Sequence, residues 1–226
     1  MDPQEIDSEY KRKASAYHEK ELQLGRDYQP YDIPSKVKER ASQIYMLVLA
    51  GDTFKRGRRR AMMCKCAYEA FKENNIWKDP ILLAKMFDVD VKKLRDAQDE
   101  FYARIHGTDL CMMFPKRHLT AKELLEDIAQ HLNVESDDNI EQEQVNVSLL
   151  HEIIDKLYDS SILMSRVSPR DIAISVVHWY RNGCGQKISV TETQKITMIA
   201  RAKLVKIVAA IEPLVNLPES ILTHVE

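Results

Sequence analysis

The sequence of 226 residues contains little glycine and proline, with six and eight residues respectively. Such a low content of helix breakers is typical of a helical protein with short connections. No glycine-rich phosphate loop occurs, and no carboxylates stand in a recognisable acid–base frame. We therefore expect a binding protein rather than an enzyme, with no catalytic residues, no cofactor and no small-molecule substrate.

Cysteine is also scarce. Cys64, Cys66, Cys111 and Cys184 form no C-x-x-C pair, and the seven histidines have no metal-ligand spacing. We expect reduced thiols and no metal site. The longest apolar run, residues 44–50, is far shorter than a membrane span, and the N-terminus has no apolar signal segment. A protein that is neither secreted nor embedded in a membrane is expected.

The charges, in contrast, are plentiful and grouped along the chain, although the net charge is only −2. Residues 36–72 contain ten bases and three acids, and residues 166–206 contain eight bases and two acids. Residues 121–160, between them, contain eleven acids and two bases. Two basic regions separated by an acidic middle predict surfaces that attract phosphate-bearing partners.

Apolar residues at helical spacing, together with capping residues, predict a chain of helices. Asp79 before Pro80 marks one start, and Thr120 and Ser189 open capping boxes with Glu123 and Glu192. The expected helices cover residues 35–50, 58–74, 81–87, 91–105, 121–132, 144–164, 170–182, 189–199 and 203–211, with a last short helix from residue 217.

The order of helix lengths and caps recurs in the second half of the chain. A single repeat offset aligns Arg60 with Arg170 and Leu94 with Leu204. In the first copy, small side chains such as Ala61, Ala67 and Ala70 line one side of a helix, which favours close packing by its neighbours. The pattern predicts a duplicated all-helical module.

Short motifs stand at corresponding places of the two copies, with Arg56-Gly57-Arg58 before a helix in the first and Ser168-Pro169 before a helix in the second. They resemble the paired cyclin repeats of general transcription factor IIB. That family has an Arg-Gly-Arg-type loop before a helix reading roughly C-x-Y-x-A-x-R. The first motif here is Arg56-Gly57-Arg58, and the second is Cys66-Ala-Tyr68-Glu-Ala70-Phe-Lys72. In the family's second repeat, Ser-Pro precedes the corresponding helix and a basic loop ends in Lys-x-Thr. These motifs stand here as Ser168-Pro169 and Lys187-Ile-Ser189.

The resemblance covers about residues 35–225 and implies an all-α fold of two tandem five-helix cyclin-like repeats. We expect an N-terminal arm or linker over residues 1–33, a first repeat over 34–133, an acidic linker over 134–143 and a second repeat over 144–226. A helix-turn-helix is expected at about residues 191–211, where Ala202 and Val205 fall near the family's base-reading positions.

The resemblance also implies a function, which is to bind promoter DNA with TATA-binding protein and to recruit RNA polymerase. A factor of this kind acts in the nucleus, or in a cytoplasmic virus factory if it comes from a large DNA virus. The expected DNA-binding residues are Lys55, Arg56, Arg58, Arg59, Arg60, Arg170, Lys187, Arg201, Lys203 and Lys206.

Two other functions remain open. A regulatory cyclin that docks on a protein kinase would use a lysine and a glutamate of the first repeat, for which Lys85 and Glu123 are available. A cyclin-fold scaffold without DNA binding would explain the short, uncharged side chains of Ala202 and Val205.

Overall fold

The computed structural model of the protein describes residue 15 and residues 18–49, 54–133, 146–160, 164–184, 186 and 188–215. These residues form α-helices with two short 3-10 turns and contain no strand, so the expected all-helical class is confirmed. No helix within the described ranges is long and apolar enough to cross a membrane. The expected linker at 134–143 and the short helix from residue 217 lie outside those ranges.

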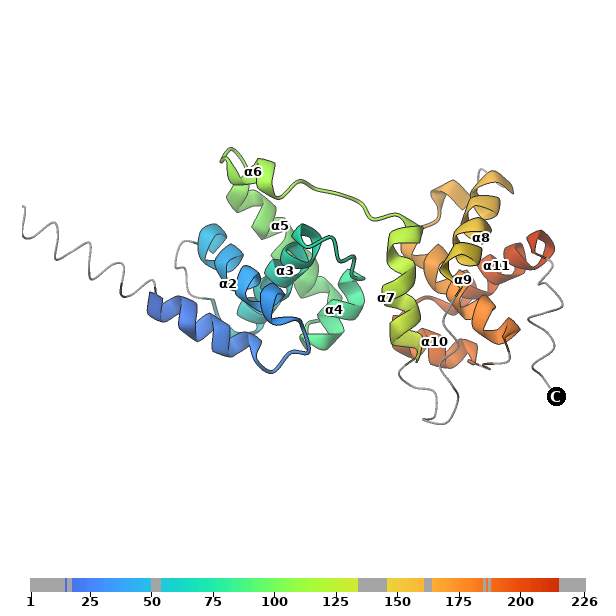
Figure 1. Ribbon diagram of the computed structural model, residues 1–226, viewed down its shortest axis with the longest axis horizontal. Helices are drawn as coiled ribbons and strands as arrows, with labels where there is room; N and C mark the ends of the chain where they lie inside the picture. Colours follow the sequence, from blue (N-terminus) through green and yellow to red (C-terminus); the bar gives the residue numbers. More distant parts are fainter. Residues whose placement is uncertain are drawn as a thin grey trace, which may run out of the picture. The chain divides into compact units, whose positions relative to one another are not determined.

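The chain divides into two compact units, Met1–Lys116 and Arg117–Glu226 (Figure 1). This division falls earlier than the expected boundary after residue 133. The helix α7 (Ala121–Asn133) was expected to end the first repeat, but it packs against helices of the second unit. Its Lys122 Nζ lies 2.6 Å from the Asp155 carboxylate of α8 (Val147–Ser160). An amphipathic helix signals that one face is buried, but not which neighbour buries it.

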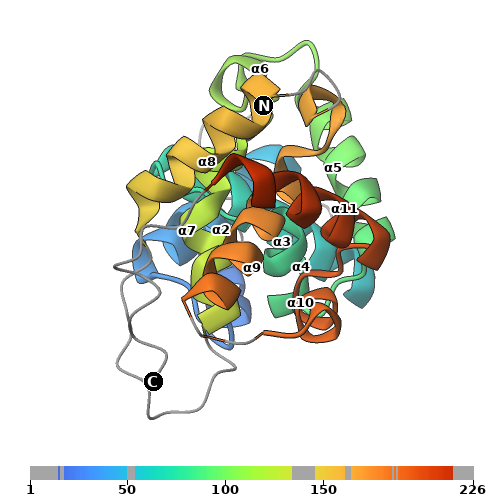
Figure 2. The same cartoon turned by 90° about the vertical axis from the view of Figure 1, so that its right-hand side faces the viewer.

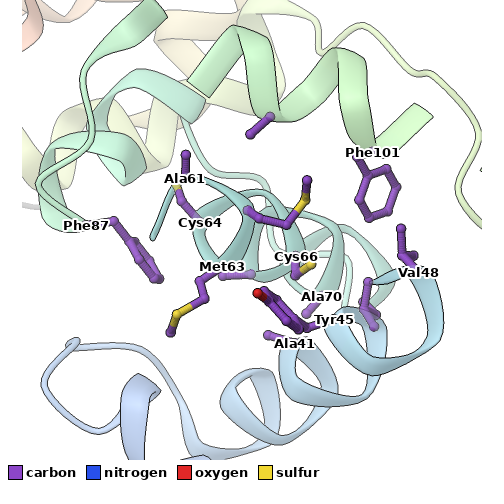
Figure 3. Packing of buried hydrophobic residues seen from close by; sticks show 14 of the residues in the cluster. Ala41, Tyr45, Val48, Ala61, Met63, Cys64, Cys66, Ala70, Phe87 and Phe101 are labelled. Carbon is purple, nitrogen blue, oxygen red and sulfur yellow. The ribbon is translucent and has the colours of Figure 1, made fainter. Parts of the chain in front are cut away.

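In the first unit, α3 (Arg56–Glu73) packs against α2 (Ser35–Leu49), α4 (Pro80–Met86) and α5 (Val91–Ile105). A four-residue helix, α6 (Leu110–Met113), follows α5. Small buried residues of α3, including Ala61 and Ala70, allow the neighbouring helices to come close. Figure 3 shows them among the larger side chains of Tyr45, Phe87 and Phe101. The small-residue pattern in the sequence therefore does mark a central helix.

Part of the expected arm belongs to this first unit. Residues 18–28 are helical, and Leu24 and Tyr28 are buried in the core. The Tyr28 hydroxyl donates a hydrogen bond of 2.9 Å to the Met63 carbonyl of α3. The ring of Tyr31 stacks on Phe87 with a centroid separation of 3.9 Å. The segment is polar along much of its length, and Leu24, Tyr28 and Tyr31 give it apolar contacts with the rest of the unit.

In the second unit, α9 (Pro169–Gly183) packs against α7, α8 and α11 (Arg201–Ile211), as Figure 2 shows from the side. The helix α10 (Val190–Thr197) lies before α11. Short 3-10 turns cover Met164–Arg166 and Glu212–Leu214. The unit buries Leu150, Ile172, Val177, Leu204 and Ile211 among its apolar residues.

The two units keep the same register over one pair of consecutive helices, α4 and α5 in the first unit and α10 and α11 in the second. α4 begins at Pro80 and α10 at Val190, while α5 begins at Val91 and α11 at Arg201, so both pairs of starts are separated by the repeat offset found in the sequence. The turn between each pair of helices contains a left-handed residue, Asp88 with φ 51° or Met198 with φ 60°, at the same offset. The two helix pairs therefore share their local backbone design.

Candidate nucleic-acid interface

The sequence dictates where α10 begins. The Ser189 hydroxyl accepts a hydrogen bond of 3.1 Å from the Glu192 backbone N–H, and the Glu192 carboxylate accepts one of 2.8 Å from the Ser189 N–H. This is the expected capping box. The hydrogen bonds from Ser189 lower the pKa of Glu192 and keep it ionised near the positive end of the helix dipole.

A three-residue turn, residues 198–200, connects α10 to α11. Leu204, Ile207 and Ile211 bury one side of α11. The opposite side of its first two turns is exposed. It carries Arg201, Ala202, Lys203, Val205 and Lys206. A pair of short helices was expected over residues 191–211, and the structure has this pair with a basic, solvent-facing start to the second helix.

The cations of this region differ in how they are held. Lys203 Nζ lies 2.8 Å from the Asp171 carboxylate of α9, so this cation is partly neutralised. Arg201 and Lys206 form no ion pair with another described residue. Arg170 donates a hydrogen bond to the Thr197 carbonyl and so attaches α9 to the end of α10. Lys187 lies outside the residues that the structure describes.

The other expected contacts surround the start of α3. Lys55 is the exposed N-cap residue, and its side chain makes no capping hydrogen bond. The first turn of α3 contains no acidic residue. Cations at this end of a helix oppose the helix dipole. Lys55 and Arg56 thus add positive charge to an end that is already positive.

Three of the expected arginines form ion pairs within the first unit. Arg58 bonds to Glu100 of α5 at 2.8 Å, and Arg60 bonds to Asp88 at 2.6 Å. Arg59 pairs with Asp27 of helix 18–28. The sequence indicated the cluster of cations but not these carboxylates, because the partners lie 28 to 42 residues away along the chain.

An open pocket of about 480 Å³ lies between helix 18–28 and the start of α3. The expected DNA-binding residues include the three arginines that line this pocket, but none of its other lining residues. A faint signal was present, because Gln23 and Asp27 are one helical turn apart and share a face. The walls are formed by Gln23, Asp27, Tyr31, Arg56, Arg59, Arg60 and Met63.

Two further lysines, Lys92 and Lys93, are exposed at the start of α5 and were not among the expected contacts. They correspond to Ala202 and Lys203 at the repeat offset. A Cβ atom at Gly57 would lie 3.9 Å from Lys93 Cε, so the starts of α3 and α5 are adjacent. Lys93 also pairs with Asp90 at 3.0 Å. The first unit therefore has its own basic surface.

Cys64 and Cys66 of α3 are buried in the core of the first unit. Burial raises the pKa of the Cys64 thiol to about 12 and raises that of Cys66 still further above its usual value. Both side chains are therefore protonated at neutral pH and are poor nucleophiles. Among the described residues, no three histidine, cysteine or acidic side chains gather as metal ligands would.

No protein-family model matches this chain, and no curated protein matches it either.

Proposed function

We propose that this protein is a transcription factor IIB-like promoter-assembly factor that binds promoter DNA with TATA-binding protein and recruits RNA polymerase. In this proposal the two units are cyclin-like repeats. Helix 18–28 with α2 to α5 forms the first, and α7 with α8 to α11 forms the second. The constant offset between the starts of α4 and α10 and between those of α5 and α11 supports this interpretation.

The exposed, basic start of α11 carries the proposal. A short helix, a three-residue turn and a second helix with outward-facing cations suit a DNA backbone, which attracts lysine and arginine through its phosphates. Ala202 and Val205 offer only small apolar surfaces to base edges, such as the methyl group of thymine. Affinity in this proposal comes mainly from phosphate contacts, and TATA-binding protein supplies the position on the promoter.

The first unit faces RNA polymerase in this proposal, with its own basic surface at the starts of α3 and α5. The kinase-docking alternative is weakened by one observation. Lys85 belongs to α4 of the first unit, whereas Glu123 belongs to α7 of the second. The Glu123 carboxylate also accepts a hydrogen bond of 2.9 Å from the Thr120 N–H and pairs with Arg117. The Glu123 side chain is therefore engaged in capping the start of α7.

A mobility-shift assay with promoter duplex, with and without TATA-binding protein, tests the proposal. Lys203→Glu combined with Lys206→Glu should weaken binding and flatten its salt dependence, since each lost phosphate contact reduces the slope by about 0.9. Lys206→Glu alone is the cleaner variant, because Lys203 also pairs with Asp171.

Lys156→Glu on α8 is the matched control, with the same charge change in the same unit on an exposed residue. If Lys156→Glu weakened DNA binding equally, the effect would come from the change in net charge and not from contacts of α11. Unchanged binding of the double variant at low salt, or no shift of the wild-type protein in either lane, would reject the proposed role of α11.

A further inference from the structure

The pocket of the first unit has walls of two chemical kinds. Arg56, the neighbouring Arg59 and Arg60, and Met63 come from successive turns of α3, and Gln23, Asp27 and Tyr31 stand opposite. Its volume of about 480 Å³ falls within the range of roughly 300–1,000 Å³ that is typical of small-molecule sites. The cations form one wall, and the remaining residues supply apolar and hydrogen-bonding surface.

The cationic wall is suited to a phosphate group. Three arginines and one acidic residue, Asp27, line the pocket. Asp27 pairs with Arg59. Asp88, which does not line the pocket, forms an ion pair with Arg60 at 2.6 Å. These pairs fix the positions of two guanidinium groups. Arg56 has no ion pair with a described residue, so its charge is open to a ligand. Planar guanidinium groups bind phosphate oxygens in pairs.

The rest of the pocket offers more than a phosphate requires. Tyr31 is held by its stacking on Phe87, and Met63 is a buried apolar side chain. Burial raises the pKa of the Tyr31 hydroxyl, which is therefore neutral and can both donate and accept hydrogen bonds. The Gln23 amide donates one hydrogen bond of 3.2 Å to Asp27 and keeps a second donor and an acceptor for a ligand. An aromatic ring, a thioether and an amide suit a nucleoside attached to the phosphate.

We propose that this pocket binds a nucleoside 5′-phosphate, which is either a free nucleotide or the phosphorylated end of a nucleic-acid strand. The site lies wholly in the first unit, whereas the proposed promoter contacts lie on α11 of the second. The pocket proposal therefore stands independently of the promoter proposal.

Calorimetric titration of the full-length chain with adenosine 5′-monophosphate at low salt is the first test. The wild-type protein should show saturable binding to one site. Arg56→Ala should weaken it about tenfold or more, because a charge-assisted phosphate contact is lost. Arg56 is exposed at the first position of α3 and holds no other element in place, so this variant should fold normally. Circular dichroism checks its helix content.

Arg58→Ala is the matched control. Arg58 is only two residues away and carries the same charge, but it bonds to Glu100 and does not line the pocket. Its variant should bind adenosine 5′-monophosphate as the wild type does. Equal weakening by Arg58→Ala would reduce the effect to general electrostatics and overturn the proposal, as would a wild-type protein that shows no saturable binding at millimolar ligand.

Other probes separate the two parts of the ligand. Adenosine and inorganic phosphate should each bind several-fold more weakly than the monophosphate. Equal affinity for inorganic phosphate would overturn the nucleoside assignment, and tighter binding of a phosphoserine peptide would assign the pocket to a protein partner instead.

A trinucleotide with and without a 5′-phosphate tells the two sources apart. A phosphate-dependent trinucleotide complex that is tighter than the monophosphate complex supports a strand end, and the reverse order supports a free nucleotide. Lys203→Glu with Lys206→Glu should leave monophosphate binding unchanged, so a failure of the promoter proposal is distinguishable from a failure of this one.

Discussion

The central helices of the two units perform the same packing task with different interiors. α3 buries the charged pair of Lys65 and Glu69, each 3% exposed or less. At the repeat offset, α9 has Ser175 and Trp179 in their place. Ser175 is buried and donates a hydrogen bond of 2.8 Å to the Asp171 carbonyl within its own helix. The same helix arrangement therefore tolerates either an ion pair or a neutral polar residue at its centre.

The charged interior of the first unit is held by several partners at once. The Glu69 carboxylate pairs with Lys65 and accepts a hydrogen bond of 2.8 Å from Lys72 Nζ. The Tyr102 hydroxyl of α5 donates to the same carboxylate at 3.3 Å. Burial lowers the pKa of Lys65, and the nearby Glu69 opposes that shift. Glu69 therefore supplies the counter-charge that compensates the burial of Lys65.

Removal of Glu69 should have the largest effect of the predicted changes. Glu69→Ala leaves a buried lysine without its counter-charge, which typically costs about 3–5 kcal/mol. The free energy of unfolding of the first unit should fall by roughly this amount. Each unit contains one tryptophan, Trp77 or Trp179, so variants with a single tryptophan report on the units separately in urea titrations.

Ser175→Ala in the second unit is the matched comparison. It removes one neutral hydrogen bond within a helix and should cost only about 1 kcal/mol. A Glu69→Ala variant with a cost as small as this would show that water or a side-chain movement relieves the lysine, and the proposed contrast between the two interiors would fail.

An intermediate effect is expected from acid. His178 of α9 occupies the position that corresponds to Tyr68 of α3. Its ring lies 2.8 Å from the Thr193 hydroxyl, and burial lowers its pKa below the usual value of 6.5. Because the unfolded chain binds the proton more readily, this histidine stabilises the second unit above about pH 6.5, and that contribution is lost as the pH falls toward the lower folded-state pKa.

The urea midpoint of the second unit, followed through Trp179, should therefore decrease between pH 7 and pH 5.5. His178→Gln should show a smaller decrease, since glutamine keeps a hydrogen-bonding side chain but does not titrate. An equal decrease in the variant would assign the acid sensitivity to other groups. The first unit has tyrosine at the corresponding position and lacks this particular titration.

Much of the helix order was predictable because local signals set it. Asp79 accepts a hydrogen bond from the first turn of α4, as its position before Pro80 indicated, and Asp90 starts α5 in the same way. Leu94 and Ile105 are buried on one side of α5, in keeping with the helical spacing of apolar residues from which a helix over residues 91–105 was predicted. These features depend on residues within about four positions of each other, so the sequence shows them directly.

Features that depend on distant segments were not predictable. The polar helix 18–28 is attached through Tyr28 and Leu24, which sequence alone does not distinguish from exposed residues. The assignment of α7 to the second unit depends on its neighbours rather than its own pattern. The candidate site shows the same division. Its cations were found, but the pairing of Arg59 with Asp27 and the pocket between them required the fold.

The smallest predicted effect concerns the two matching turns. Asp88 and Met198 both have a positive φ, a conformation that costs an ordinary side chain roughly 1–2 kcal/mol, whereas aspartate tolerates it better. Met198 is 61% exposed, so its side chain adds little packing in return. Glycine removes the strain but makes the unfolded chain more flexible. Met198→Gly should therefore stabilise the second unit by about 0.5–1 kcal/mol.

Asp88→Gly should give no such gain, because it relieves less strain and also removes the ion pair with Arg60, which is worth about 0–1 kcal/mol on an exposed surface. Urea titrations through Trp179 for the first variant and Trp77 for the second measure the two changes. A loss of stability in Met198→Gly would mean that the methionine side chain packs more firmly than its exposure indicates. Equal changes in both variants would mean that the backbone alone sets the cost of these turns. The ion pair between Arg60 of α3 and Asp88, in the turn between α4 and α5, would then contribute nothing to the difference between the units.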